Sequence, residues 1–203
     1  MARSLHAVRE RSRGATIWIT GLPASGKSTL AFAVEAALLA RGRAAYVLDG
    51  DNVRTGLCSD LGFGADDRRE NVRRVAEVAR LFADAGTLAV VALISPDAAS
   101  RAAARRVHHD AGLPFLEVWM DTPLEVCEGR DPKGLYARAR AGTLQGLTGV
   151  DAPYDRPDHP DVVLRTVTMT PEEEVAHVLR ALDSAEAGAV RPPSAPSLPL
   201  PSA

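Results

Sequence analysis

Cysteine is scarce in this 203-residue sequence, which contains only Cys58 and Cys127. Their spacing suits neither a metal site nor a disulfide framework, so we expect a reducing, cytoplasmic environment. No apolar run approaches the length of about 18 residues that a membrane span needs. The net charge of −2 gives no reason to expect nucleic acid or an acidic membrane surface as a partner.

The length suits one α/β domain with a proper core, and we find no internal repeat. We expect the domain to comprise residues 15–187. Residues 1–14 are predicted to be a basic flexible leader without the apolar core of a secretory signal. Residues 188–203 hold five of the fourteen prolines and are predicted to be a disordered Pro/Ser/Ala tail.

A glycine-rich motif with the pattern Gly21-x-x-x-x-Gly26-Lys27-Ser28 lies between an apolar run and an alanine- and leucine-rich stretch. This strand, loop and helix order is the context that a phosphate-binding loop requires, with backbone N–H groups and the helix dipole directed at the phosphates. Lys27 can reach the outer phosphates, and the Ser28 hydroxyl is suited to ligate Mg²⁺. The nucleotide-binding residues are therefore predicted to be Gly21, Leu22, Pro23, Ala24, Ser25, Gly26, Lys27, Ser28 and Thr29.

Apolar runs and helical periodicities alternate along the rest of the chain, which predicts a parallel sheet of about five strands flanked by helices. Residues 131–160 are rich in Gly, Pro, Arg and Asp, and a segment of this kind inside a compact domain predicts a functional lid. The expected strands are residues 16–20, 44–48, 87–94, 115–120 and 161–166.

Several helix ends are also predicted. Asp66 or Asp67 is expected to cap a helix that stops at Gly86, and Thr170 is expected to cap the last helix. A further helix is expected to follow Ser95-Pro96-Asp97 and run to about His109. His108 and His109, near its end, are interpreted as surface or capping residues.

Three classes of phosphate-loop protein can be compared. A GTPase needs Asn-Lys-x-Asp, but neither of the two asparagines is followed by lysine. A motor or transporter ATPase normally has an acid at the end of a central strand, where this chain has Ser95-Pro96. A small-molecule kinase fits better, because Asp49 and Asp51 follow a strand at the edge where open α/β sheets bind ligands. Nearby arginines suit an anionic acceptor.

Beyond this loop, a series of strings resembles the adenylylsulfate kinases over roughly residues 13–182. The resemblance implies a P-loop kinase fold and transfer of the ATP γ-phosphate to the 3′-hydroxyl of adenosine 5′-phosphosulfate (APS). The strings are Asp49-Gly-Asp-Asn-Val-Arg54-x-Gly-Leu57, Asp67-Arg68-x-Glu70-Asn71-Val-Arg73-Arg74, Leu81-Phe-Ala-Asp-Ala-Gly86, Ile94-Ser-Pro96, Glu117-Val, Asp121-Thr-Pro-Leu-Glu-Val-Cys-Glu128, Arg130-Asp-Pro-Lys-Gly-Leu-Tyr136 and Gly146-x-Thr-Gly-Val-Asp151.

The resemblance also implies roles for single residues. Asp51 is the candidate general base or metal-water anchor, and Asp49 joins Ser28 as the Mg²⁺ partner, although the two acids could exchange roles. Arg130 would pack on the ATP adenine, and Lys133 would contact phosphates from the lid. The catalytic candidates are Asp51, Lys27 and Ser95, and the acceptor-binding candidates are Asp51, Arg54, Phe63, Arg68, Asn71, Ile94, Ser95 and Leu147.

Two of these roles have alternatives. Ser95 matches a serine assigned as a phosphorylated intermediate in bacterial relatives, but it could instead orient backbone groups, because direct transfer needs no covalent step. Phe63 could stack on the acceptor adenine or anchor its loop on the core. The resemblance further implies a possible homodimer and an ATP sulfurylase working alongside it.

The sequence departs from the family at three places. The family's Tyr-Arg pair is replaced by Asp97-Ala98, and the lid carries Gln145 and Leu147 in place of Lys and Phe. The residues predicted to bind ATP are unaffected by these changes, whereas the acceptor side loses positive charge at Ala98 and Gln145 and an aromatic ring at Leu147. These changes are compatible with weaker APS binding or with another small anionic or nucleotide acceptor. A nucleotide-binding paralogue with little activity is a third alternative, but the intact Lys27, Ser28, Asp49 and Asp51 argue against it.

Overall fold

The computed structural model describes residues 14–188. The predicted leader, apart from Gly14, and the predicted tail from residue 189 onward lie outside the described residues. Within them, no helix combines the length and the apolar character needed to cross a membrane.

Strands and helices alternate along the chain as predicted, with two short helices inside the segment expected to form a lid or next to it. The strands are β1 (Thr16–Thr20), β2 (Ala45–Asp49), β3 (Leu88–Ala92), β4 (Phe115–Met120) and β5 (Val162–Leu164). The helices are α2 (Lys27–Ala40), α3 (Gly50–Thr55), α4 (Ala65–Asp84), α5 (Ala98–Asp110), α6 (Leu124–Arg130), α7 (Leu135–Arg140) and α8 (Pro171–Gly188).

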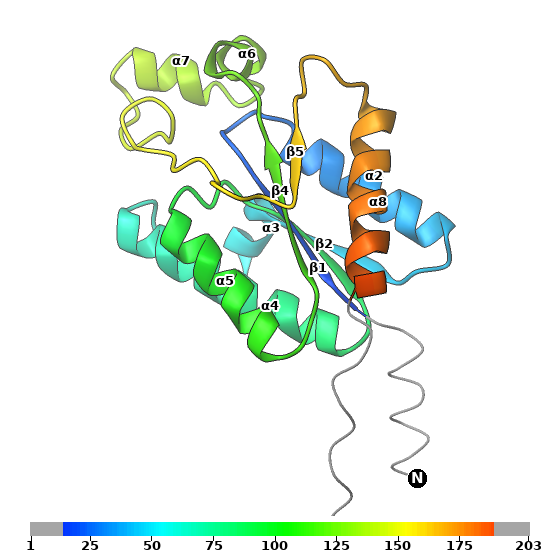
Figure 1. Ribbon diagram of the computed structural model, residues 1–203. Helices are drawn as coiled ribbons and strands as arrows, with labels where there is room; N and C mark the ends of the chain where they lie inside the picture. The colour runs from blue at the N-terminus through cyan, green and yellow to red at the C-terminus, as the bar shows by residue number, and fades with distance from the viewer. Residues whose placement is uncertain (1–13, 189–203) are drawn as a thin grey trace, which may run out of the picture.

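The five strands form one parallel sheet in the order β2-β3-β1-β4-β5, which confirms the predicted fold class. Helices α2 and α8 cover one face, whereas α4 and α5 cover the other (Figure 1). Because every strand runs in the same direction, all carboxyl ends meet at one edge of the sheet. The loops that follow β1, β2, β3 and β4 are therefore neighbours in space.

Burial on both faces explains why the central strands are continuous apolar runs rather than alternating ones. In β1, Ile17 and Ile19 pack into the cluster formed with α2 and α8. Trp18 points to the opposite face, where it packs with α4 and α5 residues and lies 5.8 Å from the Phe115 ring. One strand thus contributes to both halves of the core.

The helix ends follow the predictions in part. The side chain of Asp97 accepts a hydrogen bond from Ser100 N and caps α5. Thr170 caps α8 by accepting from Glu173 N, and Thr170 N donates to the Glu173 carboxylate in return. The predicted cap of α4 is wrong, because Gly64 occupies that position and Asp66 and Asp67 lie in the first turn. There the two acids still interact favourably with the helix dipole.

His108 is the clearest correction to the sequence interpretation. Its side chain is fully buried, with Nε2 2.8 Å from Thr16 Oγ1 and Nδ1 2.8 Å from the Ala104 carbonyl oxygen. Arg101, Ala104 and His108 share the inner face of α5 at spacings of three and four residues. This helical periodicity could have indicated that His108 is buried. Burial lowers the pKa of His108 below its ordinary value.

We predict that this buried imidazole makes the protein less stable at mildly acidic pH. The unfolded chain protonates His108 near the ordinary pKa of histidine, about 6.5, whereas the folded protein resists protonation until lower pH. The unfolded state therefore binds more protons in this window, and the free energy of unfolding decreases as pH falls below about 6.5. Urea unfolding of the wild-type protein and of His108→Gln between about pH 7.5 and 5.5 measures this contribution.

The variant should show a flatter dependence on pH, because glutamine does not titrate there. The neighbouring His109, which lies on the exposed side of α5, supplies the control: His109→Gln should keep the wild-type slope. Identical slopes for all three proteins would contradict the assignment.

Candidate active site

The loop between β1 and α2 has the backbone that a phosphate site needs. Gly26, immediately before α2, has φ of 101°, and Gly21 has φ of 153°. Both values are strained for a residue with a Cβ, and a Cβ at Gly21 would lie 2.9 Å from Ser25 Oγ. The glycines therefore allow the loop to curl into α2, whose N-terminus carries the positive end of the helix dipole.

Lys27 lies at the start of α2 with its ammonium group inside this loop. Its Nζ donates to the Leu22 carbonyl oxygen at 2.6 Å and to Ser25 Oγ at 3.4 Å. Burial lowers the pKa of Lys27 to about 8, although nearby acids such as Asp49 act in the opposite direction. A phosphate entering the loop would supply the negative charge that this buried cation lacks.

A short hydrogen bond joins the phosphate loop to the end of β2. Ser28 Oγ donates to Asp49 Oδ2 at 2.5 Å, while Asp49 Oδ1 accepts from Asp51 N at 3.0 Å and caps α3. The hydroxyl and the carboxylate are hard oxygen donors of the kind that Mg²⁺ prefers, and Mg²⁺ usually takes only one or two protein oxygens beside phosphates and water. The oxygens of Ser28 and Asp49 are therefore the candidate Mg²⁺ ligands. Residues 14–188 contain no group of three or more His, Cys, Asp or Glu side chains that could hold a metal ion.

Asp51 lies in the first turn of α3, at the mouth of the site. Its carboxylate forms an ion pair with Lys133 Nζ, which comes from the segment between α6 and α7. Both side chains are mostly exposed, so the pair contributes little stability. At the end of α6, Arg130 Nη1 donates to Ser25 O of the phosphate loop at 3.4 Å.

Arg54 of α3 lies against an aromatic ring of the loop that follows this helix. Arg54 Nη1 donates to the Gly62 and Leu61 carbonyl oxygens, and its guanidinium carbon lies 4.4 Å from the centre of the Phe63 ring. Phe63 is 71% exposed, which rules out a role as a core anchor. An exposed aromatic ring held by an arginine is suited to stack on a planar ligand.

Arg68 and Asn71 lie one turn apart on α4. Arg68 donates to Thr148 Oγ1 of the lid at 2.8 Å and to the Gly146 carbonyl oxygen, and burial together with nearby Arg54 lowers the pKa of Arg68. Asn71 Nδ2 is, among the described residues, the one buried side-chain polar atom without a hydrogen-bond partner. Such an atom needs a partner, and a ligand can provide one.

Arg73 and Arg74, further along α4, form ion pairs with Glu70, and Arg74 also pairs with Asp60. These pairs lie at the surface and account for both arginines without a ligand.

Ser95 follows β3 and is buried, with φ of 39°. Its Oγ accepts from Trp18 Nε1 at 3.1 Å and donates to Thr20 Oγ1 at 3.1 Å. Thr20 Oγ1 in turn donates to the Ile94 carbonyl oxygen at 2.7 Å. None of these partners is a base, so the contacts favour an orienting role for Ser95 over a nucleophilic one.

Residues of the lid, α6 and the phosphate loop form a small core apart from those beside the sheet. Cys127, Tyr136 and Leu147 are buried together, and the Tyr136 hydroxyl donates to the Pro23 carbonyl oxygen at 3.0 Å. The side chain of Leu147 is thus buried in this core, whereas Phe63 is exposed. Sequence reasoning missed the contact between Tyr136 and the phosphate loop, since nothing in the local pattern indicates it.

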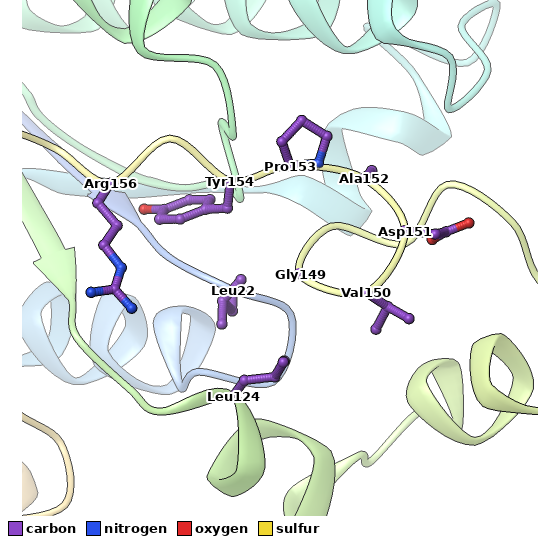
Figure 2. Close-up of a pocket in the computed structure, with 9 residues that line it drawn as sticks. All are labelled: Leu22, Leu124, Gly149, Val150, Asp151, Ala152, Pro153, Tyr154 and Arg156. Atoms are coloured by element: carbon purple, nitrogen blue, oxygen red, sulfur yellow. The ribbon is translucent and has the colours of Figure 1, made fainter.

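A cavity of about 480 Å³ lies between the phosphate loop, α6 and the returning segment of the lid. Figure 2 shows Tyr154 and Arg156 of that segment on one side of the cavity, with Leu22 and Leu124 across from them. Lys27, Asp51 and Arg68 do not line it. The cavity is therefore separate from the residues predicted to do chemistry, and it marks the side on which the lid meets the phosphate loop.

Comparison with known proteins gives a consistent result. The family model for adenylylsulphate kinase matches residues 13–165. The bifunctional enzyme CysN/CysC of Mycobacterium tuberculosis is 54% identical over 90% of this chain, but the chain spans only 30% of that enzyme's length. An adenylyl-sulfate kinase of Emericella nidulans is 51% identical over 86% of this chain and 87% of its own. A solved structure of the M. tuberculosis APS kinase CysC with AMPPNP and APS superposes with a TM-score of 0.82 at 54% identity, covering 84% of this chain and 98% of that one.

We predict that nucleotide binding protonates Lys27. Near pH 8.5 much of Lys27 is neutral in the free protein, because its pKa is about 8, and triphosphate oxygens would raise that pKa. Calorimetry of ATP binding without an acceptor, in two buffers of different ionisation enthalpy, should therefore report proton uptake at about pH 8.5 and little at about pH 6.5.

The control is Lys27→Arg, whose guanidinium stays protonated across this range. Proton uptake of equal size in both proteins, or none in the wild type, would show that Lys27 does not carry the effect.

Proposed function

The chain belongs to the adenylylsulfate kinase family, and on that basis we propose that it transfers the γ-phosphoryl group of ATP to the 3′-hydroxyl of APS. The observation that carries the proposal is the 2.5 Å hydrogen bond from Ser28 Oγ to Asp49 Oδ2. This bond joins a complete phosphate loop to the loop that resembles the family's acceptor site. The loop for the phosphoryl donor and the loop for the phosphoryl acceptor are thereby held next to each other, and such positioning is the main requirement of phosphoryl transfer.

The proposed reaction is a direct in-line transfer. The acceptor 3′-oxygen forms a bond to the γ-phosphorus while the bond to the β–γ bridging oxygen breaks, which releases ADP. The proton of the hydroxyl passes to Asp51, whose carboxylate must first part from Lys133. Lys133 can then interact with the negative charge that develops on the phosphates.

Ser28 and Asp49 would hold a Mg²⁺ ion, and Lys27 would contact the outer phosphates from inside the loop. When bound, Mg²⁺ neutralises charge on the β- and γ-phosphates. The chain's own part is to keep the two oxygen ligands together and to keep Lys27 buried, so that its charge acts in a medium of low dielectric. Arg130, which reaches the carbonyl of Ser25, would lie beside the nucleotide.

The acceptor would bind between α3, α4 and the lid. Phe63 would stack on the adenine while Arg54 stays against the Phe63 ring. Asn71 would donate its unpaired N–H to the acceptor. Arg68 would exchange the lid oxygens of Gly146 and Thr148 for the anionic group of the acceptor, because an arginine binds such oxygens more strongly.

A second candidate is the same transfer to a different anionic or nucleotide acceptor. Three departures from the family favour it: Ala98 and Gln145 carry no positive charge, and Leu147 packs with Cys127 and Tyr136 in the lid. Each removes a contact that the acceptor side would otherwise have. The nucleotide side carries no comparable departure.

Partners follow from the chemistry. APS must be made from sulfate and a nucleotide before this step, so we propose that an enzyme with ATP sulfurylase activity acts upstream. The CysN/CysC enzyme of Mycobacterium tuberculosis is bifunctional and much longer than this chain. We also propose a homodimer, which size-exclusion chromatography with light scattering would test.

We predict ADP formation that depends on APS when the protein is given ATP, Mg²⁺ and APS. Parallel reactions with AMP, with other nucleotides and without an acceptor supply the comparison. Turnover with another acceptor in the absence of turnover with APS would support the second candidate, and no acceptor-dependent turnover at all would refute both.

We further predict that Asp51→Asn slows transfer by about 10²- to 10⁴-fold, because the amide cannot accept the proton. ATP binding should stay intact, since Ser28, Asp49 and Lys27 are unchanged. Asp66→Asn is the matched control: Asp66 is also an exposed acid in a first helical turn, paired with Arg69. If Asp51→Asn retained near-normal turnover, another group would have to be the base.

A further inference from the structure

We propose that Arg101 is a positioning residue for phosphoryl transfer, which holds the returning end of the lid and the Ser95 end of β3 in one fixed arrangement. The inference rests on the proposed function and concerns a residue outside the predicted site. Arg101 lies on α5 and is only 3% exposed. A buried guanidinium must satisfy its donors within the protein, so its contacts define what it holds.

Three different parts of the fold meet at this guanidinium. Nε donates to Glu117 Oε1 of β4 at 2.9 Å, and Nη1 donates to the Ser95 carbonyl oxygen at 2.7 Å. Nη2 donates to the Asp155 carbonyl oxygen of the lid's returning segment at 2.6 Å. Glu117 balances the charge, while the other two bonds fasten backbone atoms that are 60 positions apart in sequence, from 95 to 155.

The returning segment is fastened further at the same place. Asp155 N donates to the Pro96 carbonyl oxygen at 2.9 Å, and Asp155 Oδ2 accepts from Ala98 N at 3.1 Å. The Tyr154 hydroxyl lies 3.0 Å from Thr20 Oγ1, at the end of β1 where the phosphate loop begins. The Tyr154 ring, visible in Figure 2 beside Leu22, has the Arg101 guanidinium 5.6 Å from its centre.

Ser95 is the reason to assign this anchor a role in the reaction rather than in stability alone. Its φ of 39° is uncommon for a residue with a Cβ, and such a backbone persists only when its surroundings enforce it. Arg101 holds its carbonyl, and Trp18 and Thr20 hold its hydroxyl. The strained residue directly follows Ile94, which is among the predicted acceptor contacts. Arg101 therefore acts through Ser95 and the lid, not by touching a substrate.

The test compares Arg101→Lys with Arg105→Lys. Lysine keeps the charge beside Glu117 but has one ammonium group in place of the planar fork, so it cannot make the three contacts together. Arg105 is the matched control, because it donates to Glu117, Asp161 and the Phe115 carbonyl oxygen and not to Ser95 or Asp155. Both changes weaken the same charge cluster, and only the first releases the lid.

We expect Arg101→Lys to lower kcat with APS by about ten- to a hundredfold, because small displacements of positioned groups have effects of this size. The KM for ATP should change by less than about twofold, since the phosphate loop keeps its own contacts. Arg105→Lys should leave both constants close to wild type. Equal losses of melting temperature in the two variants with unchanged kcat would overturn the proposal.

Hydrogen–deuterium exchange provides a readout that does not need activity. In Arg101→Lys, the amides of Asp155 and Ala98 should exchange faster than in Arg105→Lys, and unchanged exchange would overturn the proposal. If the wild-type protein fails to use APS, the proposed function fails, while this measurement still decides whether Arg101 anchors the lid. Should Arg101→Lys not fold, Tyr154→Phe replaces it: this variant removes the hydroxyl beside Thr20, and it should change kcat and exchange in the same direction. No change in either would also overturn the proposal.

Discussion

The hydrogen bond between Ser28 and Asp49 is the contact on which the rest of the site depends. Strands β1 and β2 are not neighbours, because β3 lies between them. With strands about 5 Å apart, the loops after β1 and β2 start roughly 10 Å from each other. The first turn of α2 and a carboxylate at the very end of β2 close that gap. The same carboxylate caps α3, so one side chain sets both the candidate metal-binding pair and the direction in which α3 leaves the sheet.

The parallel sheet explains why residues distant in sequence meet in this site. Thr20, Asp49, Ser95 and Asp121 all lie at or just beyond the carboxyl end of a strand, and the strand order brings them to one edge. Such an edge collects polar groups whose hydrogen bonds the strands cannot satisfy. The chain satisfies them with each other, through Thr20, Ser95 and Tyr154, and leaves only Asn71 Nδ2 without a partner among its described buried side-chain atoms.

Much of the fold could be predicted because local patterns determined it. Strand β4 was predicted with its observed bounds, since an apolar run is closed by Pro114 on one side and Asp121 on the other. The interpretation failed where a local rule competed with packing. His108 looked polar and terminal, yet the inner face of α5 buried it, and Gly64 took the cap position expected for an acid.

The candidate site could be identified in outline, but not its internal contacts. Single-residue roles there remain predictions. The pairs of Arg68 with Thr148 and of Arg101 with Asp155 join positions that are 80 and 54 residues apart. No sequence pattern specifies which lid residue an arginine will contact, because that depends on the path of the lid in space.

The two ends of the lid are held by interactions of different strength. At the returning end, the buried Arg101 guanidinium donates to the Asp155 carbonyl oxygen, and breaking that bond would leave a buried charged donor without a partner. At the leading end, Lys133 and Asp51 are exposed, and water can replace either partner at little cost. The end of the lid at Asp155 is therefore held to the sheet more firmly than the end at Lys133 is held to Asp51.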